Sequence, residues 1–409
     1  MPSSVSRPPE QRFSASYTSR DLILYGLGIG CCFEDDFEDG KALDNESCFV
    51  FEQHEQFQPF PTFPLALAFS AVAEGRLPEF GVVPFPPKSM RGEGGSGMLP
   101  RVFLRDNDVD LSLCPAVHVS QSLRLYQPLP VPITRSHSES GDDRVWDGPY
   151  DPPVCLSLST QIVSVIPKRA GTFITTETEY RMKDKFIGAP ICAARSTVLL
   201  VGVPPDTVIP YQREEETSIL VAPELTTLFG TIPWRSIKSS IKKSPQKNKL
   251  KPDFSMQYQI QSNQALLYRL SGDYNPLHVY QSLSDFRVRE GQTTKNSKPV
   301  LHGLCTLGFA VRAILRYFDT YNPDVTYVSC GFVRPVLVGD RIRVSVWDGK
   351  HREAERGDDT KVNSRRGTFL CCFQVHNIDS EVLVVDRGLA EFTACSSLNP
   401  KSNVTLSKL

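Results

Sequence analysis

An internal repeat constrains the fold of this chain more than any other feature of its sequence. The segment SRDLILYGLGIG (residues 19–30) aligns without a gap on SNQALLYRLSGD (residues 262–273), which places Tyr25 on Tyr268. Self-similarity over such a distance indicates two related structural units. The chain has 409 residues, enough for two such units with a sizeable core.

Each half carries one apolar helix pattern followed by strand patterns. In the second half, LHGLCTLGFAVRAILRYF (residues 301–318) has apolar residues at helical spacing and almost no polar face, which predicts a buried central helix. PTFPLALAFSAVAEG (residues 61–75) takes this role in the first half. The segments after each helix are rich in Val, Ile, Phe and Thr, as is typical of strands. We therefore predict an α+β fold in which an antiparallel sheet wraps round a central helix, twice.

A basic stretch interrupted by proline marks the junction between the halves. RSIKSSIKKSPQKNKLKP (residues 235–252) is too poor in apolar residues to bury a core, which predicts a solvated linker. The first repeat is then expected at residues 1–234, the second at residues 253–397, and a flexible tail at residues 398–409.

Composition excludes several classes of protein. The 45 Lys and Arg residues nearly balance the 46 Asp and Glu residues, so the chain lacks the positive field of a general nucleic-acid-binding protein. No run approaches the roughly 20 apolar residues of a membrane span, and the N-terminal residues lack the apolar region of a secretion signal. The 11 cysteines lack the C-x-x-C spacing of a zinc or redox site and are expected to be reduced and mostly buried.

The C-terminal tripeptide predicts a location in the cell. Ser407, Lys408 and Leu409 match the S-K-L address that a peroxisomal import receptor reads at a C-terminus. The preceding SSLNPKSNVTL is polar and is expected to be mobile, as a receptor-bound tail requires. We predict import into the peroxisome, or into a related organelle such as a glycosome, with the import receptor as a partner.

The segment YRLSGDYNPLH (residues 268–278) concentrates polar groups directly after an apolar run. Asp273, Asn275 and His278 lie close together, and Pro276 biases the residue before it toward an extended turn, so the three side chains can converge on one small volume. A carboxyl group beside an imidazole suits general acid–base chemistry. A capping aspartate next to a satisfied core histidine is the structural alternative.

A second candidate lies at the start of the predicted central helix. Gly303 there lets a carbonyl approach backbone N–H groups at the positive end of the helix dipole, although helix–sheet packing would also favour glycine. The preceding His302 is expected to be a local hydrogen-bonding partner. No ligand spacing supports a metal site of His302 with Asp273 and His278, and no metal is predicted.

These segments, YRLSGDYNPLHVY and KPVLHGLCTLGFAVRAIL, together resemble the signature of 2-enoyl-CoA hydratase 2, the (R)-specific MaoC-like hydratases found alone or within peroxisomal multifunctional enzyme type 2. The resemblance runs from about Phe13 to Ala394 and includes the divergent N-terminal repeat of the family. It implies a double hotdog fold, a homodimer, an acyl-CoA substrate of β-oxidation and no metal or organic cofactor. The second repeat would be catalytic and the first would bind the acyl chain and CoA.

The resemblance also assigns roles to residues. Adding water to an enoyl thioester needs a base for the water, a proton for C2 and a stabilised enolate oxygen. Asp273 and His278 would supply the first two functions, with Asn275 between them, and which of the pair takes the water proton is left open. Gly303 would supply the third. Contacts to the acyl-CoA carry over to three further residues, namely Lys168 at a CoA phosphate, Phe332 beside the substrate, and His118.

Two departures are visible, one between the two repeats and one from the family pattern. In the repeat alignment Asp273 falls on Gly30, and CCFEDD replaces YNPLH, so the first repeat is expected to be catalytically silent. The resemblance implies that this repeat forms a broader tunnel for the acyl chain. The glycine that follows His118 in the family is Val119 here. An acyl-CoA thioesterase with a hotdog fold, or a non-catalytic acyl-CoA-binding protein, are the rival interpretations; the complete Asp273 to His278 motif favours the hydratase.

Overall fold

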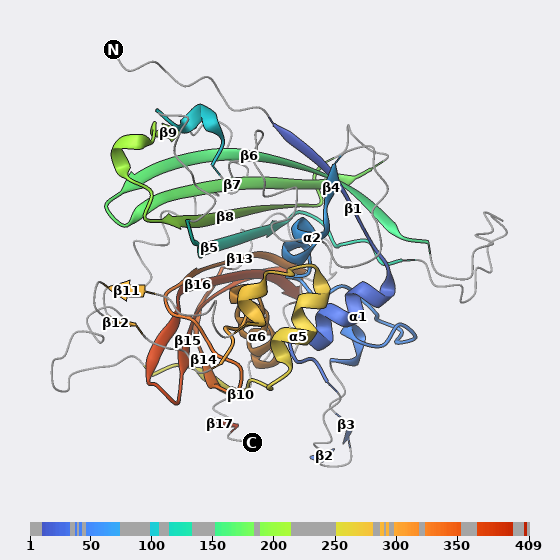
Figure 1. Cartoon of the computed structure of the whole chain (residues 1–409). Coiled ribbons are helices and arrows are strands. Elements are labelled where there is room, and N and C mark those ends of the chain that lie inside the picture. Colours follow the sequence, from blue (N-terminus) through green and yellow to red (C-terminus); the bar gives the residue numbers. More distant parts are fainter. Residues whose placement is uncertain are drawn as a thin grey trace.

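The computed structural model (Figure 1) describes the chain in segments, which are residues 10–32, 37–38, 41–42, 46–73, 99–105, 114–132, 152–183, 189–213, 251–280, 287–289, 292–293, 298–318, 324–352, 366–395 and 405–406. The predicted linker lies outside these segments except for residues 251–252. The tripeptide Ser407, Lys408 and Leu409 also lies outside them.

One sheet, antiparallel except at one edge, runs through both halves of the chain. The first half contributes β1 (Gln11–Tyr17), β4 (Val72–Ala73), β5 (Ala116–Leu125), β6 (Val154–Lys168), β7 (Gly171–Met182), β8 (Cys192–Val201) and β9 (Tyr211–Gln212). The second half contributes β10 (Phe254–Gln259), β13 (Asp324–Phe332), β14 (Arg341–Arg352), β15 (Arg366–Asn377), β16 (Val382–Cys395) and β17 (Thr405–Leu406). The order is β17-β10-β14-β15-β16-β13-β5-β8-β7-β6-β1-β4, and β9 pairs with β6.

Smaller elements connect these strands. Two separate hairpins pair β2 (Phe37–Glu38) with β3 (Lys41–Ala42) and β11 (Arg287–Arg289) with β12 (Gln292–Thr293). The short 3₁₀ turns are η1 (Ser47–Phe49), η3 (Arg101–Phe103), η4 (Pro205–Thr207), η6 (Arg269–Ser271) and η7 (Pro276–His278). None of the helices in the described part of the chain is both long and apolar enough to cross a membrane.

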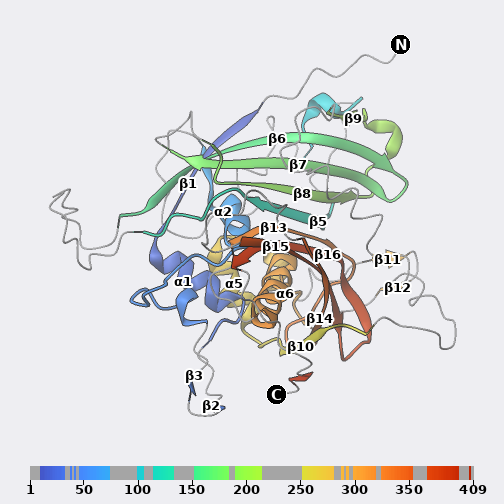
Figure 2. The same ribbon diagram turned by 180° about the vertical axis from the view of Figure 1, so that it is seen from behind.

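The two halves join where β5 pairs with β13. Gln121 lies opposite Cys330 and Ser120 lies opposite Gly331. The main-chain hydrogen bonds of this ladder make the two half-sheets continuous, because the strands come from different repeats. Figure 2 shows the second-half strands curving round the central helix, with the first-half strands extending the sheet beyond it.

The central helices of the two repeats differ in length. The second half has α6 (Gly303–Tyr317), as predicted, with 15 residues, whereas α2 (Pro64–Ser70) in the first half has 7. The predicted helix at residues 61–75 is therefore wrong in its C-terminal part. Ala71 is extended, and the two residues after it pair with β1 as strand β4. A β-branched residue such as Val72 fits a sheet better than a helix, and this pairing to a distant strand overrides the local helix pattern.

The repeated segment folds as a pair of contacting helices. Residues 19–30 form α1 (Ser19–Gly28), and the matching residues form α5 (Gln264–Tyr268) followed by η6. The matched tyrosines Tyr25 and Tyr268 lie against each other, with ring centroids 5.8 Å apart. Glycine at position 28 allows this close approach, because a Cβ there would lie 3.1 Å from the Cα of Tyr268, closer than an ordinary van der Waals contact. The α+β fold predicted from the sequence pattern is confirmed, as is the double hotdog that the resemblance implies.

One face of α6 carries buried charge, unlike the apolar helix that its sequence suggests. Arg312 and Arg316 each donate from Nε to Oε1 of Glu46, at 2.6 and 2.7 Å. Burial raises the pKa of Glu46, but the two guanidinium groups outweigh burial and hold that pKa below its usual value. Because Glu46 belongs to the first half, this cluster ties the two repeats together through the central helix.

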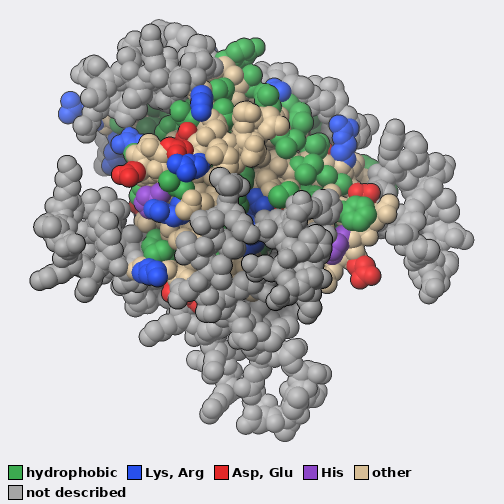
Figure 3. Space-filling model, turned by 90° about the horizontal axis from the view of Figure 1, so that it is seen from below, with side chains coloured by type: hydrophobic (Ala, Val, Ile, Leu, Met, Phe, Trp, Pro, Cys, Tyr) green, Lys and Arg blue, Asp and Glu red, His purple; other side chains and the backbone are tan. Residues whose placement is uncertain are grey.

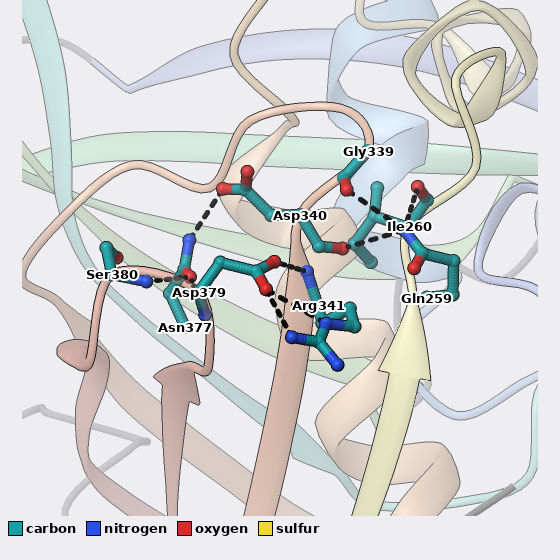
Figure 4. Close-up of polar contacts among 8 residues, drawn as sticks. All are labelled: Gln259, Ile260, Gly339, Asp340, Arg341, Asn377, Asp379 and Ser380. Carbon is teal, nitrogen blue, oxygen red and sulfur yellow. Dashed lines mark hydrogen bonds and ion pairs between the residues drawn. The ribbon is translucent and has the colours of Figure 1, made fainter. Parts of the chain in front are cut away.

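A second polar cluster lies where β10 and β15 end and β14 begins (Figure 4). Asp340 Oδ2 accepts hydrogen bonds from the backbone N–H of Leu337 and from Asn377 Nδ2, at 2.8 and 2.6 Å. Arg341 donates from Nε and a terminal nitrogen to Asp379 Oδ1. These carboxylates accept hydrogen bonds from protein donors, so we assign the cluster a structural role.

On the face in Figure 3, charged side chains of both signs are dispersed, in keeping with the balanced composition.

Candidate active site

The predicted polar motif forms a tight turn between η6 and η7. Gly272 enters this turn with a φ of 126°, a conformation that favours glycine. The Oδ1 atom of Asn275 accepts from the N–H of Leu277 at 3.0 Å, and the N–H of Asn275 donates to Oδ1 of Asp273 at 3.2 Å. Asn275 therefore shapes the turn that carries Asp273 and His278. The alternative interpretation, a capping aspartate, is correct in part, because Asp273 Oδ1 accepts this local backbone hydrogen bond.

The carboxyl group of Asp273 and the imidazole of His278 face each other. His278 Nε2 lies 4.0 Å from Asp273 Oδ2, and the side chains are only 9% and 13% exposed. The other ring nitrogen, Nδ1, lies 2.8 Å from the carbonyl oxygen of Val300. A carbonyl only accepts hydrogen bonds, so Nδ1 carries a proton and Nε2 of the neutral ring is free to accept one.

Burial moves the pKa values of these two groups in opposite directions. It raises the pKa of Asp273 to about 7, although the N–H of Asn275 and the charge of Arg269 act against it. Burial lowers the pKa of His278 to about 4, against the effect of the Val300 carbonyl. Near neutral pH the carboxyl group thus holds a proton much of the time while the imidazole is neutral. Groups separated in this way can act as acid and base together.

His302 lies against both members of this pair. Its Nε2 donates to the backbone carbonyl of Asp273 at 3.1 Å, as expected of a local hydrogen-bonding partner. Its ring stacks on that of His278, with centroids 3.6 Å apart and an angle of 25° between the planes. Potential ligand atoms of Asp273, His278 and His302 lie within 4.8 Å of one another. Imidazole binds metals in the plane of its ring, and two nearly parallel stacked rings direct their lone pairs side by side, so this donor set does not fit one ion.

The first turn of α6 places backbone N–H donors beside this pair. His302 is the residue before the helix, and no side chain in the described segments caps that end. Gly303 is partly exposed between buried neighbours. A Cβ at this position would lie 3.2 Å from the ring of Phe332. Glycine here therefore fits both interpretations. It leaves room for packing against Phe332, and its lack of a side chain would let a carbonyl oxygen approach the N–H groups.

Phe332 connects this helix start to the first repeat. Its ring lies 4.8 Å from that of His118, centroid to centroid. His118 Nε2 lies 3.1 Å from both the carbonyl oxygen of Ser120 and the hydroxyl of Ser196. Burial lowers the pKa of His118 to about 4, so this ring is neutral near pH 7. The structure thus brings Gly303, Phe332 and His118 together.

The backbone accommodates the departure at position 119. The pairing of β5 with β8 shifts between His118 and Ser120, which makes Val119 the extra residue of a β-bulge. Among the described residues, only Glu381 and Arg387 are non-glycine residues with positive φ. Val119 therefore adopts a conformation that needs no glycine.

Lys168 is not part of this cluster. It is exposed at the end of β6, which is separated from β5 by β7 and β8. Three strand spacings place β6 roughly 14 Å from β5.

Sequence reasoning missed two groups that contact the candidate residues, namely the Val300 carbonyl and the Ser196 hydroxyl. Neither belongs to a recognisable motif, because both act through contacts between distant segments.

Comparison with known families places matching domains over both halves. Residues 243–366 match the MaoC like domain, and residues 15–90 match the MFE-2 hydratase 2 N-terminal domain. The chain is 28% identical over 367 residues to the peroxisomal enoyl-CoA hydratase 2 of Arabidopsis thaliana, which covers 88% of this chain and 90% of that protein.

Longer proteins contain a similar part. The chain is 25% identical over 344 residues to peroxisomal multifunctional enzyme type 2 of Mus musculus, covering 83% of this chain but 34% of that protein. The chain therefore spans about a third of that longer relative. Among solved structures, a MaoC-like dehydratase from Phytophthora capsici superposes with a TM-score of 0.59 at 22% identity and covers 95% of this chain and 96% of its own. This likeness supports the fold.

Proposed function

We propose that this chain, which belongs to the MaoC-like hydratases with an MFE-2 hydratase 2 N-terminal domain, adds water to trans-2-enoyl-CoA to give (3R)-3-hydroxyacyl-CoA and catalyses the reverse reaction. The observation that carries the proposal is the facing pair of Asp273 and His278, whose pKa values are shifted apart beside the start of α6. The Arabidopsis relative is named for this hydratase activity. The (3R) configuration rests on the family resemblance.

The pair supplies a base and an acid for hydration. Nε2 of His278 and Oδ2 of Asp273 are 4.0 Å apart, which is too far for a direct hydrogen bond. A water between them can hydrogen-bond to both. Nε2 takes a proton from this water as its oxygen attacks C3, and the Val300 carbonyl stabilises the imidazolium through Nδ1–H. Asp273 gives its proton to C2. The proton on His278 then returns to Asp273, which restores both groups.

The start of α6 would stabilise the charge that develops during this reaction. Attack at C3 moves negative charge onto the thioester oxygen as the enolate forms. Backbone N–H groups of the first helical turn point toward that end of the helix, where the dipole also favours negative charge. The partial exposure of Gly303 supports the approach of a carbonyl to these donors.

Hydration of crotonyl-CoA by the purified chain tests the proposal. We expect the enoyl absorbance to fall without release of free CoA thiol. The acid must be protonated and the base neutral, so activity in the hydration direction should fall as pH rises above about 7 and as pH drops below about 4. Thiol release would instead identify a thioesterase, and binding without either change would identify an acyl-CoA-binding protein.

We also propose that the protein works in peroxisomal fatty-acid β-oxidation. Its relatives in Arabidopsis and mouse are named peroxisomal, and the S-K-L tripeptide matches an import address. Deleting Ser407, Lys408 and Leu409 from a tagged chain is expected to move it to the cytosol with catalysis unchanged, as fluorescence microscopy and an assay of the purified protein would show. Continued import of the truncated chain would reveal another signal. The homodimer implied by the resemblance stays a prediction.

A further inference from the structure

His302 makes two different contacts with the acid–base pair, through different parts of its ring. The first is a hydrogen bond at the ring edge, from Nε2 to the backbone carbonyl of Asp273 at 3.1 Å. This bond holds the main chain at the residue that carries the carboxyl group. The neighbouring bond from Asn275 holds one carboxyl oxygen, so the main chain and side chain of Asp273 are restrained separately.

The second contact is made by the face of the ring. The imidazoles of His302 and His278 stack at 3.6 Å, and His302 is 1% exposed. A stacked neutral ring keeps water away from one face of His278, so a charged His278 would lose solvation on that side. The ring of Tyr268, 4.9 Å away, packs on His302.

The remaining nitrogen of His302 shows that this ring is itself neutral. Nδ1 is buried and has no hydrogen-bond partner among the described residues. Protonation there would place an unpaired cation in the interior, next to His278 and near the charge of Arg269. Burial, followed by the effect of His278, holds the pKa of His302 well below its usual value.

We propose that His302 is a positioning residue, whose edge fixes the main chain of Asp273 and whose face keeps His278 in its neutral, proton-accepting form. Asp273 and His302 are the titratable groups in contact with His278, and the charge of Arg269 acts on both of them. The Val300 carbonyl accepts from Nδ1 on the other side of the ring. The inference rests on the proposed function for its kinetic consequence, whereas the state of the His278 ring can be measured without any substrate.

Two substitutions separate the two contacts. His302→Gln keeps an N–H donor within reach of the Asp273 carbonyl and removes the stacked ring. We expect the acidic limb of the kcat/KM profile to move from about 4 toward 6.5, the ordinary pKa of histidine, so that activity at pH 5 falls about 10-fold relative to pH 7. His302→Phe keeps a ring and removes the donor. We expect its kcat to fall about 10-fold at every pH, with the acidic limb unmoved, because one positioning hydrogen bond is lost.

The control is Cys305→Ala, on the same turn of α6, since Cys305 is buried and its thiol donates to the carbonyl of Gly28. This change perturbs packing at the helix start and should leave the acidic limb in place. Identical profiles for the Gln and Phe variants, or an acidic limb that stays near 4 in His302→Gln, would overturn the inference.

NMR of the ¹⁵N-labelled histidines provides a readout that does not depend on activity. In the wild-type chain we expect His278 to be protonated at Nδ1 and His302 at Nε2, with His278 remaining neutral at pH 5. The His278 pKa should rise in His302→Gln. The opposite tautomers in the wild-type protein would overturn the inference even if the variants fail to fold. If the tautomers are as expected and crotonyl-CoA is not hydrated, the proposed function fails while the positioning contacts stand.

Discussion

Asp273→Asn and His278→Gln are each expected to lower turnover at least about 100-fold while the protein stays folded, the usual scale for removing a positioned acid or base. Asparagine keeps an oxygen that can accept from the N–H of Asn275 but has no proton for C2. Glutamine can still donate to the Val300 carbonyl but has no basic nitrogen for the water. Steady-state hydration of crotonyl-CoA, with circular dichroism to verify folding, measures the loss.

The double variant provides a sharper test of the pair. Residues that act as a unit are not additive, so the double variant should be little slower than the worse single variant. Asp206→Asn, which alters an exposed carboxylate in η4, serves as the matched control and should retain wild-type turnover. Near wild-type activity in either folded single variant would remove that residue from the mechanism.

Much of the fold was predictable because its strongest signals are local. The apolar period at residues 301–318 corresponds to α6, and the apolar, β-branched segments after it correspond to β13 to β16. The repeat itself appears as two contacting helices with matched tyrosines. The length of α2 was not predictable, because it depends on the pairing of residues after Ala71 with β1, far away in the sequence.

The site shows the same division. The turn of Asp273, Asn275 and His278 and the position of Gly303 follow from short segments with a strong local pattern. Which ring nitrogen of His278 carries the proton does not follow from a local pattern. It depends on the carbonyl of Val300, 22 positions away in the sequence. The stacking of His278 on His302 likewise depends on how α6 meets the turn. The proposed assignment of base and acid within the pair therefore depends on the tertiary contacts.

Gly303→Val is expected to lower kcat about 10²–10³-fold, by analogy with the loss of one oxyanion-hole donor. Negative charge builds on the thioester oxygen as the enolate forms, so a donor aimed there stabilises the transition state more than the bound substrate. A branched side chain at this position would keep the carbonyl away from the first turn of α6. KM should change less, and steady-state kinetics on the folded variant separate the two parameters.

The structure adds a complication that a double variant resolves. The Cβ of any residue at position 303 would lie 3.2 Å from the Phe332 ring, so a loss of rate could come from displacement of this ring. Combining Gly303→Ala with Phe332→Leu makes room for the added methyl group. Recovery of kcat in the combined variant, relative to Gly303→Ala alone, would show that Gly303 acts by packing. A rise in KM with kcat unchanged in Gly303→Val would also exclude the helix-terminus mechanism. Persistence of the kcat defect in the combined variant would place the loss at the approach of the thioester oxygen to the N–H groups of α6.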